Sequence, residues 1–200
     1  MTGIENLVEK AKEYKEKGLS EKDIANELNI SPDTVTWLLT RDVKKDEKPP
    51  TDVKIGWRSI GVYGGRLGLL AGLFSDIIME EMERMDTDFE TVVGIAINGI
   101  PPAVMVSDQL GKELAVYRPP SEENKDVGGS LASNYAGVTN KKLVIVDDVI
   151  NTGETIRGAV NDLEDKGAEV VLCTVTVNKN GRDDVLGVPL RALVRAQIIG

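Results

Sequence analysis

The segment from Leu143 to Ile156 constrains the fold most, because a short apolar run is followed by two aspartates and a loop of small and hydroxyl-bearing residues. Leu143 to Val146 are continuously apolar, as in a strand that is covered on both faces. From Thr155 onward the apolar residues return at helical spacing. The segment therefore predicts a strand that ends on Asp147 and Asp148, then a loop, then a helix.

The loop between this strand and helix has the composition of an anion-binding turn. Its backbone N–H groups can converge on a phosphate, helped by the helix dipole and by the close backbone approach that Gly153 allows. The two aspartates would supply paired acceptors for vicinal sugar hydroxyls. A sugar phosphate is the predicted ligand, and the alternative is an ordinary acidic turn. The candidate residues are Asp147, Asp148, Asn151, Thr152, Gly153, Glu154 and Thr155.

The string Val-Ile-Val-Asp-Asp-Val-Ile-Asn-Thr-Gly-Glu-Thr resembles the phosphoribosyl pyrophosphate (PRPP) signature of type I phosphoribosyltransferases. The resemblance implies that the acidic pair holds the ribose hydroxyls and that the Thr-Gly-x-Thr loop binds the 5-phosphate. We expect Mg²⁺ to be carried by the phosphates of the ligand, with no direct protein ligand. Binding such a ligand and turning it over remain separate predictions.

Composition limits the remaining possibilities. Two hundred residues with 41% hydrophobic content suit one medium domain and a small one. The net charge of −9 disfavours a nucleic-acid-coating or membrane-surface role, although specific DNA binding through a small module stays open. The single cysteine, Cys173, lies in an apolar run, as in a reduced cytoplasmic protein. No apolar stretch has membrane-spanning length, so we expect no membrane contact and a cytoplasmic location.

Three short helical patterns open the chain. Residues 4–17 carry apolar side chains at the spacing of an amphipathic helix. Ser20 is a natural N-cap for a second helix with Asp23 three residues on, and Ser31 followed by Pro32 suits the start of a third. Three short helices with tight connections predict a helix-turn-helix.

The stretch Ser-Glu-Lys-Asp-Ile-Ala-Asn-Glu-Leu-Asn-Ile-Ser-Pro-Asp-Thr-Val resembles the bacterial and archaeal DNA-reading version of this motif. Its third helix would enter the major groove. Against this, residues 1–50 hold nine Lys or Arg and eleven Asp or Glu, so a helical dimerisation cap is the alternative. The residues predicted to lie near bases or phosphates are Ser31, Asp33, Thr34, Thr36, Trp37 and Arg41.

The stretch from Asp42 to Lys54 is polar, charged and broken by Pro49 and Pro50, which indicates an interdomain linker. We predict a helix-turn-helix domain over residues 1–42, a linker over 43–54 and a second domain over 55–200. Its strands and helices alternate, which predicts a type I phosphoribosyltransferase-like α/β domain with a mostly parallel sheet flanked by helices. The predicted strands are 91–97, 114–117, 143–146 and 170–177, and the predicted helices are 66–84, 101–110 and 155–166.

A second candidate loop follows the strand predicted to end at Ile97. Asn98, Gly99, Ile100 and Pro101 stand where orotate-type phosphoribosyltransferases place a loop that meets pyrophosphate through backbone amides. Alone, a Gly-x-Pro sequence marks ordinary turns. In the same domain as the PRPP signature, it predicts the pyrophosphate end of the site.

The segment after Tyr117 bears on catalysis. In orotate-type enzymes this strand ends in an Arg-Lys pair and leads into a mobile loop with a Lys-x-His-Gly-type sequence. Here Arg118 and Lys125 match, but Pro119 replaces the second cation and Val127 the histidine, and the chain contains no histidine at all. Weaker cationic clamping of pyrophosphate predicts reduced or absent turnover, with Lys125 as the one catalytic candidate. The alternative is a slipped alignment in which Lys125 suffices.

A helix-turn-helix joined by a short linker to an orotate phosphoribosyltransferase-like domain is similar, over essentially the whole chain, to archaeal transcriptional regulators of the GfcR type. The resemblance implies a DNA-binding regulator, with central sugar catabolism as its target only by analogy, whose second domain senses PRPP or a related phosphorylated ribose or nucleotide. We also predict a homodimer that recognises a palindromic operator. Two alternatives stay open, a working phosphoribosyltransferase with a helical assembly domain and a ligand-sensing interaction protein without DNA.

Overall fold

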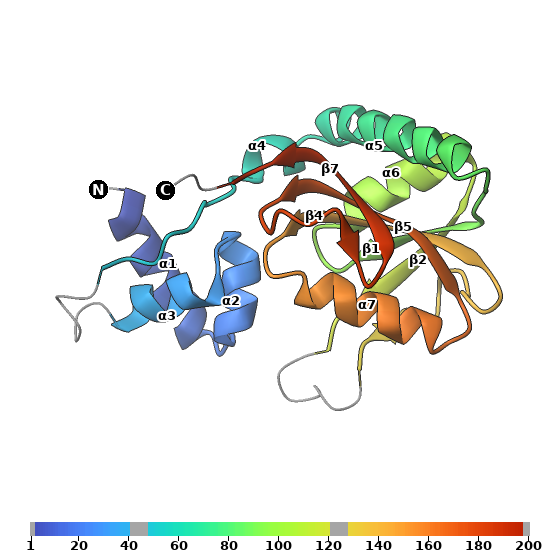
Figure 1. The fold of residues 1–200 in the computed structure, drawn as a ribbon. Coiled ribbons are helices and arrows are strands. Elements are labelled where there is room, and N and C mark those ends of the chain that lie inside the picture. The colour runs from blue at the N-terminus through green and yellow to red at the C-terminus, as the bar shows by residue number, and fades with distance from the viewer. Residues whose placement is uncertain (1–2, 41–47, 121–127, 198–200) are drawn as a thin grey trace. The chain divides into compact units, whose positions relative to one another are not determined.

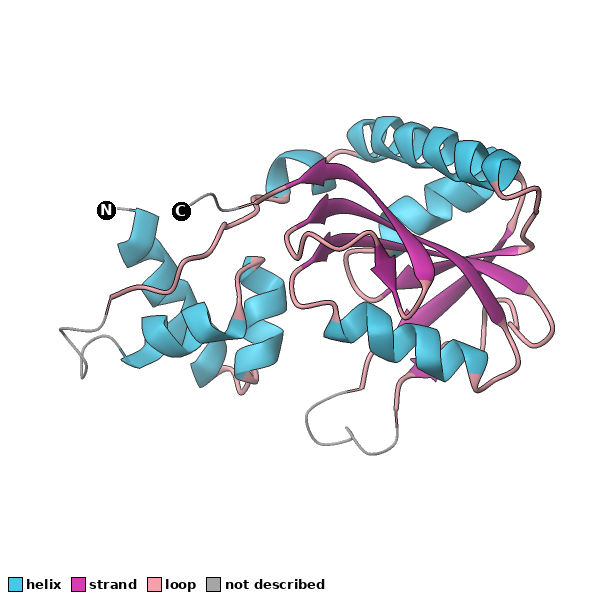
Figure 2. Ribbon diagram, viewed as in Figure 1, coloured by secondary structure: helices cyan, strands magenta, loops and turns pink. Residues whose placement is uncertain are grey.

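The chain divides into two compact units, Met1–Gly56 and Trp57–Gln197. The computed structural model describes residues 3–40, 48–120 and 128–197. Each unit has its own hydrophobic core, formed in the first unit by helices and in the second by helices packed on a sheet (Figures 1 and 2). The predicted fold class, an α/β domain with a helical N-terminal region, is confirmed.

Three helices form the N-terminal unit: α1 (Gly3–Glu16), α2 (Glu21–Leu28) and α3 (Pro32–Thr40). The predicted cap of α2 is present, since the Ser20 hydroxyl accepts from the Asp23 N–H and the Asp23 carboxylate accepts from the Ser20 N–H. All three helices and the turn before α3 contribute to one core. Its buried residues are Ala11, Ile24, Ala25, Leu28, Ile30, Val35 and Leu38.

The second unit is built on a seven-stranded sheet in the order β3-β2-β1-β4-β5-β7-β6. Five strands run parallel, and the two-residue strands β3 and β6 pair antiparallel with their neighbours at the two edges. Such short edge strands offer little backbone for pairing with another chain. The strands are β1 (Thr91–Ile95), β2 (Glu113–Arg118), β3 (Ser130–Leu131), β4 (Lys142–Ile150), β5 (Glu169–Asn178), β6 (Asp184–Val185) and β7 (Val188–Arg195).

Helices cover both faces of the sheet. Helices α5 (Gly64–Arg84) and α6 (Ile100–Leu110) lie on one face, and α7 (Glu154–Glu164) lies on the other (Figure 1). A one-turn helix, α4 (Arg58–Gly61), precedes α5. Covering on both faces explains why the centre of β4 is a continuous apolar run. No helix in the described ranges is long and apolar enough to cross a membrane.

Two predicted strand ends are wrong. Strand β4 continues to Ile150 instead of ending on the aspartates, because β5 runs alongside it as far as the pair Ile150–Asn178. Strand β1 ends at Ile95 rather than at Ile97, and its pairing with β4 stops at Gly94 and Val146. The predicted helices are present with ends shifted by one or two residues.

The sequence did not predict β7, which is eight residues long and pairs parallel with β5. Pro189 has no N–H and therefore argues against a strand at this position. It is tolerated because it is the second residue of β7 and faces Asp184 of the two-residue strand β6. Strand β7 therefore lies between β5 and the short edge strand β6.

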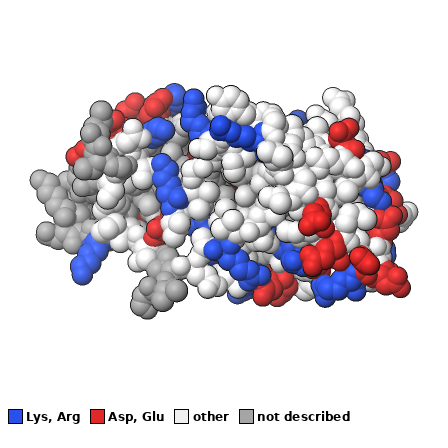
Figure 3. All heavy atoms as spheres, turned by 90° about the horizontal axis from the view of Figure 1, so that it is seen from above, with Lys and Arg blue, Asp and Glu red and all other residues white. Residues whose placement is uncertain are grey.

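The outward side of α5 differs from the other helix surfaces. Leu69 and Leu73 are exposed there, beside the exposed glycines Gly65 and Gly72. Figure 3 looks onto this side of the unit and shows a broad area without charged side chains. The inward side of α5 packs Leu70, Ala71, Phe74, Ile78 and Met82 into the core above the sheet.

Candidate ligand-binding site

The two central strands define a crevice at one edge of the sheet. Strand β1 pairs with β2 on one side and with β4 on the other, so the strand order reverses between β1 and β4. In open α/β sheets, ligands bind outside the carboxyl ends of the strands at this point. Asp147 and Asp148 follow directly after the last β1–β4 pair, Gly94 with Val146. The acidic pair therefore stands at the carboxyl end of this crevice.

A hydrogen bond joins the two loops that the sequence singled out. The Asn98 side-chain amide donates to Asp148 Oδ2 at 2.9 Å, across fifty residues of chain. The other oxygen, Asp148 Oδ1, accepts from the Val149 N–H at 2.7 Å. Asp147 Oδ1 accepts from the Asp148 N–H at 2.9 Å. Asn98 and Asp148 are thus brought together as one polar group.

Both carboxylates are buried, with 8% of Asp147 and 6% of Asp148 exposed. Burial holds the pKa of Asp147 well above its ordinary value, and the neighbouring Asp148 carboxylate raises it further. Burial also raises the pKa of Asp148, while hydrogen bonds from the Val149 N–H and the Asn98 side chain oppose the rise. Two buried acids side by side are costly to ionise. Hydroxyl donors or a cation at this position would lower that cost.

Gly99 fixes the loop between β1 and α6 against β4. A Cβ at Gly99 would lie 2.5 Å from the Val146 carbonyl oxygen and 2.7 Å from the Ile95 carbonyl oxygen, so no other residue fits without a shift of backbone. The peptide bond between Ala96 and Ile97 in the same loop is cis. This close approach of the two backbones is what places Asn98 beside Asp148.

Most amides of this loop already have partners. The Gly99 N–H donates to the Ile95 carbonyl at 3.0 Å and the Ile100 N–H donates to the Ile97 carbonyl at 3.2 Å. Pro101 has no N–H to offer. The predicted pyrophosphate contact through backbone amides stays a prediction, with Asn98 as the loop residue best placed to donate.

The predicted phosphate loop lies between β4 and α7. Gly153 precedes the first residue of α7 with a φ of +86°, in the left-handed region that favours glycine. The Thr152 hydroxyl accepts from the Glu154 N–H at 3.3 Å. Asn151, Thr152, Glu154 and Thr155 are half-buried or exposed and lie at the N-terminal end of α7, where a helix favours an anion.

Asn180 is a site residue that the sequence did not indicate. Its side-chain Nδ2 lies 3.1 Å from where a Cβ on Gly153 would stand, so it adjoins the phosphate loop. Asn178 holds this turn, because its Oδ1 accepts from the Asn180 N–H at 2.9 Å and from the Gly181 N–H at 3.1 Å. The string Asn-Lys-Asn-Gly has the composition of an ordinary turn, and only the pairing of β4 with β5 brings it to the loop.

Of the two predicted cations, Arg118 lies in the part of the chain that the structure describes and Lys125 does not. Arg118 is the exposed last residue of β2, next to Tyr117, whose carbonyl accepts from the Ala96 N–H at 2.8 Å. It therefore lies on the same edge of the sheet as Asn98. Lys125 lies in residues 121–127, outside the described residues.

The stem of the segment after β2 is tied to α7 by a side chain that the sequence did not single out. Asp162 Oδ2 accepts from the Tyr117 hydroxyl at 2.6 Å and from the Gly129 N–H. Burial raises the pKa of the Tyr117 hydroxyl, and its bond to Asp162 adds to the rise. Gly129 lies so close to the Tyr117 ring that a Cβ there would overlap the hydroxyl. These contacts connect β2 to the helix that begins at the phosphate loop.

The residues that the structure describes form no metal cage of their own. In the ranges that the structure describes, no three or more His, Cys, Asp or Glu side chains gather so as to hold an ion. Mg²⁺ commonly binds through one or two carboxylates together with ligand phosphates. Mg²⁺ carried by the phosphates of the ligand, with no direct protein ligand, stays a prediction.

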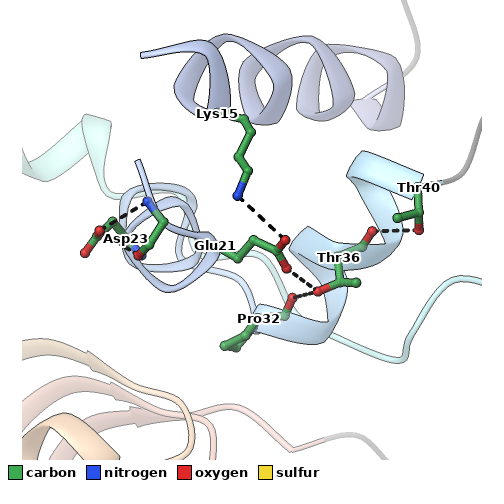
Figure 4. Close-up of polar contacts among 7 residues, drawn as sticks. Lys15, Glu21, Asp23, Pro32, Thr36 and Thr40 are labelled. Carbon is green, nitrogen blue, oxygen red and sulfur yellow. Dashed lines mark hydrogen bonds and ion pairs between the residues drawn. The ribbon is translucent and has the colours of Figure 1, made fainter. Parts of the chain in front are cut away.

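Two of the predicted DNA-reading side chains, Thr34 and Thr36, donate to carboxylates of the chain itself. The Thr36 hydroxyl donates to Glu21 Oε2 at 2.6 Å and to the Pro32 carbonyl at 3.1 Å (Figure 4). Lys15 forms an ion pair with the same glutamate at 3.8 Å. The Thr40 hydroxyl donates to the Thr36 carbonyl at 2.8 Å. The Thr36 side chain is exposed, but its hydroxyl is already hydrogen-bonded within the unit.

The N-terminal end of α3 is held by Asp52. Asp52 Oδ2 accepts from the Ser31 N–H at 2.6 Å and from the Thr34 hydroxyl at 2.9 Å. Asp33 is exposed, and Trp37 packs against the core of the unit with part of its ring exposed. Arg41 falls outside the described residues. Helix α3 itself contains no lysine or arginine, so its surface offers hydroxyls and an aromatic ring rather than positive charge.

Residues 65–196 match the family described as phosphoribosyl transferase domain. The transcriptional regulator GfcR of Thermoplasma acidophilum is 46% identical over 200 residues, which cover 100% of this chain and 99% of that protein. Both findings concern sequence, and together they span the whole chain.

Two solved structures share the fold. The orotate phosphoribosyltransferase from Aeropyrum pernix has a TM-score of 0.59 and 22% identity, covering 74% of this chain and 81% of its own. The orotate phosphoribosyltransferase of Mycobacterium tuberculosis H37Rv in complex with PRPP has a TM-score of 0.56 and 20% identity, covering 70% and 80%. On the strength of the sequence relationship, this chain belongs to the GfcR family of transcriptional regulators and carries a phosphoribosyl transferase domain.

Proposed function

We propose that this protein is a DNA-binding transcriptional regulator that senses PRPP, or a related phosphorylated ribose or nucleotide, in its second unit. The observation that carries the proposal is the buried pair Asp147 and Asp148, joined to Asn98 at the carboxyl edge of the sheet. This polar group is suited to a sugar that carries hydroxyl donors.

The proposed roles follow the geometry of the crevice. Asp147 and Asp148 accept from the ribose hydroxyls, which would relieve the cost of burying two acids. The loop from Asn151 to Thr155 binds the 5-phosphate at the N-terminal end of α7, close to Asn180. Mg²⁺, carried by the ligand, would neutralise part of the phosphate charge. The residues proposed for the pyrophosphate end are Asn98, Gly99, Arg118 and Lys125.

The N-terminal unit, proposed as residues 1–42 with a linker over 43–54, reads DNA with α3. The protein would act as a cytoplasmic homodimer whose two α3 helices meet half-sites of a palindrome about one helical turn, ~34 Å, or a multiple of it apart. Since α3 has no lysine or arginine to contact phosphates, DNA binding should be specific, with little nonspecific background. The hydroxyls of Thr34 and Thr36 would exchange their bonds to Asp52 and Glu21 for bonds to DNA.

The test measures both ligands on the same preparation. Calorimetry with PRPP should give saturable binding, and footprinting on the protein's own upstream region and on sugar-metabolism promoters should show a discrete protected site. Incubation with PRPP and free bases should yield little or no nucleotide. Turnover in the ordinary enzymatic range, about 1 to 1000 per second, would favour the working transferase instead.

A further inference from the structure

The outward side of α5 leaves large apolar side chains in water. Leu69 is 76% exposed and Leu73 is 56% exposed, one helical turn apart. Gly65 and Gly72 are exposed nearby on the same helix, and a Cβ at either glycine would meet nothing within 4 Å. Burying one leucine is worth about 1.5–3 kcal/mol, so a partner that covered both would gain a substantial free energy. Figure 3, which looks onto this side of the unit, shows a broad area without charged side chains.

Opposite charges stand at the two ends of this apolar stretch. Arg66 and Asp76 are both exposed and share the face of Leu69 and Leu73, since the four positions follow the three- and four-residue steps of a helix seam. The Arg66 guanidinium is already oriented, because it donates to the Ser59 carbonyl and stacks 4.5 Å from the centre of the Tyr63 ring. The surface is therefore basic at its start and acidic at its end.

The spacing of these residues is symmetric about Ala71. Leu69 and Leu73 lie two residues on either side of it, and Arg66 and Asp76 lie five residues on either side. If two such helices cross antiparallel about a two-fold axis on the outward face, at the height of residue 71 along the helix, each Leu69 faces Leu73 of the partner subunit. Each Arg66 then faces Asp76 of the partner subunit, and this pairing occurs twice.

We propose that this surface, the α5 face formed by Arg66, Leu69, Leu73 and Asp76, joins two copies of this chain with their α5 helices antiparallel. This surface would be the interface of the homodimer described under the proposed function, and the inference rests on that homodimer. A second copy is the occupant that the charges specify, because the face is complementary to itself only in this orientation. A parallel pair would place Asp76 against Asp76, which opposes association.

Sedimentation velocity of the full chain, without DNA or PRPP, tests the interface. The parent protein should be a dimer at micromolar concentration. The double variant Leu69→Glu with Leu73→Glu should sediment as a monomer. Its dimer dissociation constant should rise at least about a hundredfold, because the interface would bury four like charges. Ile4→Glu, an exposed apolar position on α1, is the matched control and should leave the dimer unchanged.

A charge exchange tests the antiparallel orientation. Arg66→Asp and Asp76→Arg should each weaken the dimer about tenfold, because each creates two like-charge pairs. The variant carrying both changes restores opposite pairs and should dimerise nearly as well as the parent. Circular dichroism confirms in each case that the variant is folded.

Three results would overturn the proposal: a monomeric parent protein, a Leu69→Glu and Leu73→Glu variant that dimerises as tightly as the parent, or a double charge exchange no tighter than the single changes. PRPP calorimetry on the monomeric variant separates this proposal from the proposed function. If the charge variants weaken and restore the dimer as expected, but the protein binds neither PRPP nor DNA, the interface stands and the sensing role is rejected.

Discussion

The two regions proposed to bind ligands, the crevice at Asp147 and Asp148 and the surface of α3, satisfy their polar groups in opposite ways. The carboxylates of the crevice are buried side by side and share few donors, so the site is costly until a ligand supplies hydroxyls or a cation. On α3, Thr36 and Thr34 already donate to Glu21 and Asp52. We therefore expect a ligand to complete the first region, and we expect DNA to displace internal contacts in the second.

The largest effect is expected from the acidic pair. Asp147→Asn with Asp148→Asn replaces two charged acceptors with amides, and charge-assisted hydrogen bonds are worth about 1.5–3 kcal/mol each. PRPP affinity, measured by calorimetry, should fall at least about a hundredfold. Asp165→Asn, at the exposed end of α7, is the control and should bind as the parent does. Equal affinity of the double variant and the parent would remove these residues from the site.

The next effect concerns the loop that holds Asn98 in place. Gly99→Ala should destabilise the fold by about 2–4 kcal/mol, because the new Cβ collides with the carbonyl oxygens of Val146 and Ile95. Gly158→Ala is the matched control, since Gly158 lies within α7 with nothing near its Cβ position. That change should stabilise the protein by about 0.5–1 kcal/mol. Urea unfolding of both variants measures the difference, and equal stabilities would show that Gly99 does not hold β1 and β4 together.

A smaller effect is expected on stability as a function of pH. The folded protein raises the pKa of Asp147, so the stability linked to this group is complete below the ordinary aspartate pKa and is lost as the pH rises through the raised value. Asp147→Asn should therefore raise the melting temperature of the ligand-free protein more at pH 8 than at pH 4. A gain of about 2–4 °C corresponds to 1 kcal/mol in a protein of this size. A melting temperature that falls at pH 8 would contradict the direction of the shift.

The smallest effect concerns α3. Glu21→Gln removes the carboxylate that binds Thr36, and should strengthen operator binding about three- to fivefold by freeing the hydroxyl and removing a negative charge. Glu27→Gln, on the same helix and exposed, makes the same change of charge without touching Thr36. If both variants gain equally in gel-shift titrations, the effect is one of net charge and the contact with Thr36 plays no part.

The features that could be predicted from the sequence are those set by neighbours along the chain. The capping pair of Ser20 and Asp23, the helix that begins after Gly153 and the apolar centre of β4 all depend on local pattern. The same holds for the two loops, which carry their glycines at positions where the backbone must come close or turn.

The features that were missed depend on contacts between distant segments. Strand β4 extends to Ile150 only because β5 runs beside it, and the proline in β7 hid that strand. Asn180 reaches the phosphate loop, and Asp52 reaches the start of α3, across twenty or more residues. A residue pattern in one segment holds no information on which distant side chain will meet it, so these contacts required the fold.

The central claim is that the crevice and α3 belong to one regulator, and therefore that PRPP and DNA affect each other's binding. Quantitative footprinting at fixed salt should show operator affinity change by about 5- to 150-fold at saturating PRPP, with the reciprocal change in PRPP affinity when operator is present. The Asp147→Asn and Asp148→Asn variant should bind the operator but lose the response. Operator affinity that is unchanged by saturating PRPP, in a protein that binds both, would contradict the account.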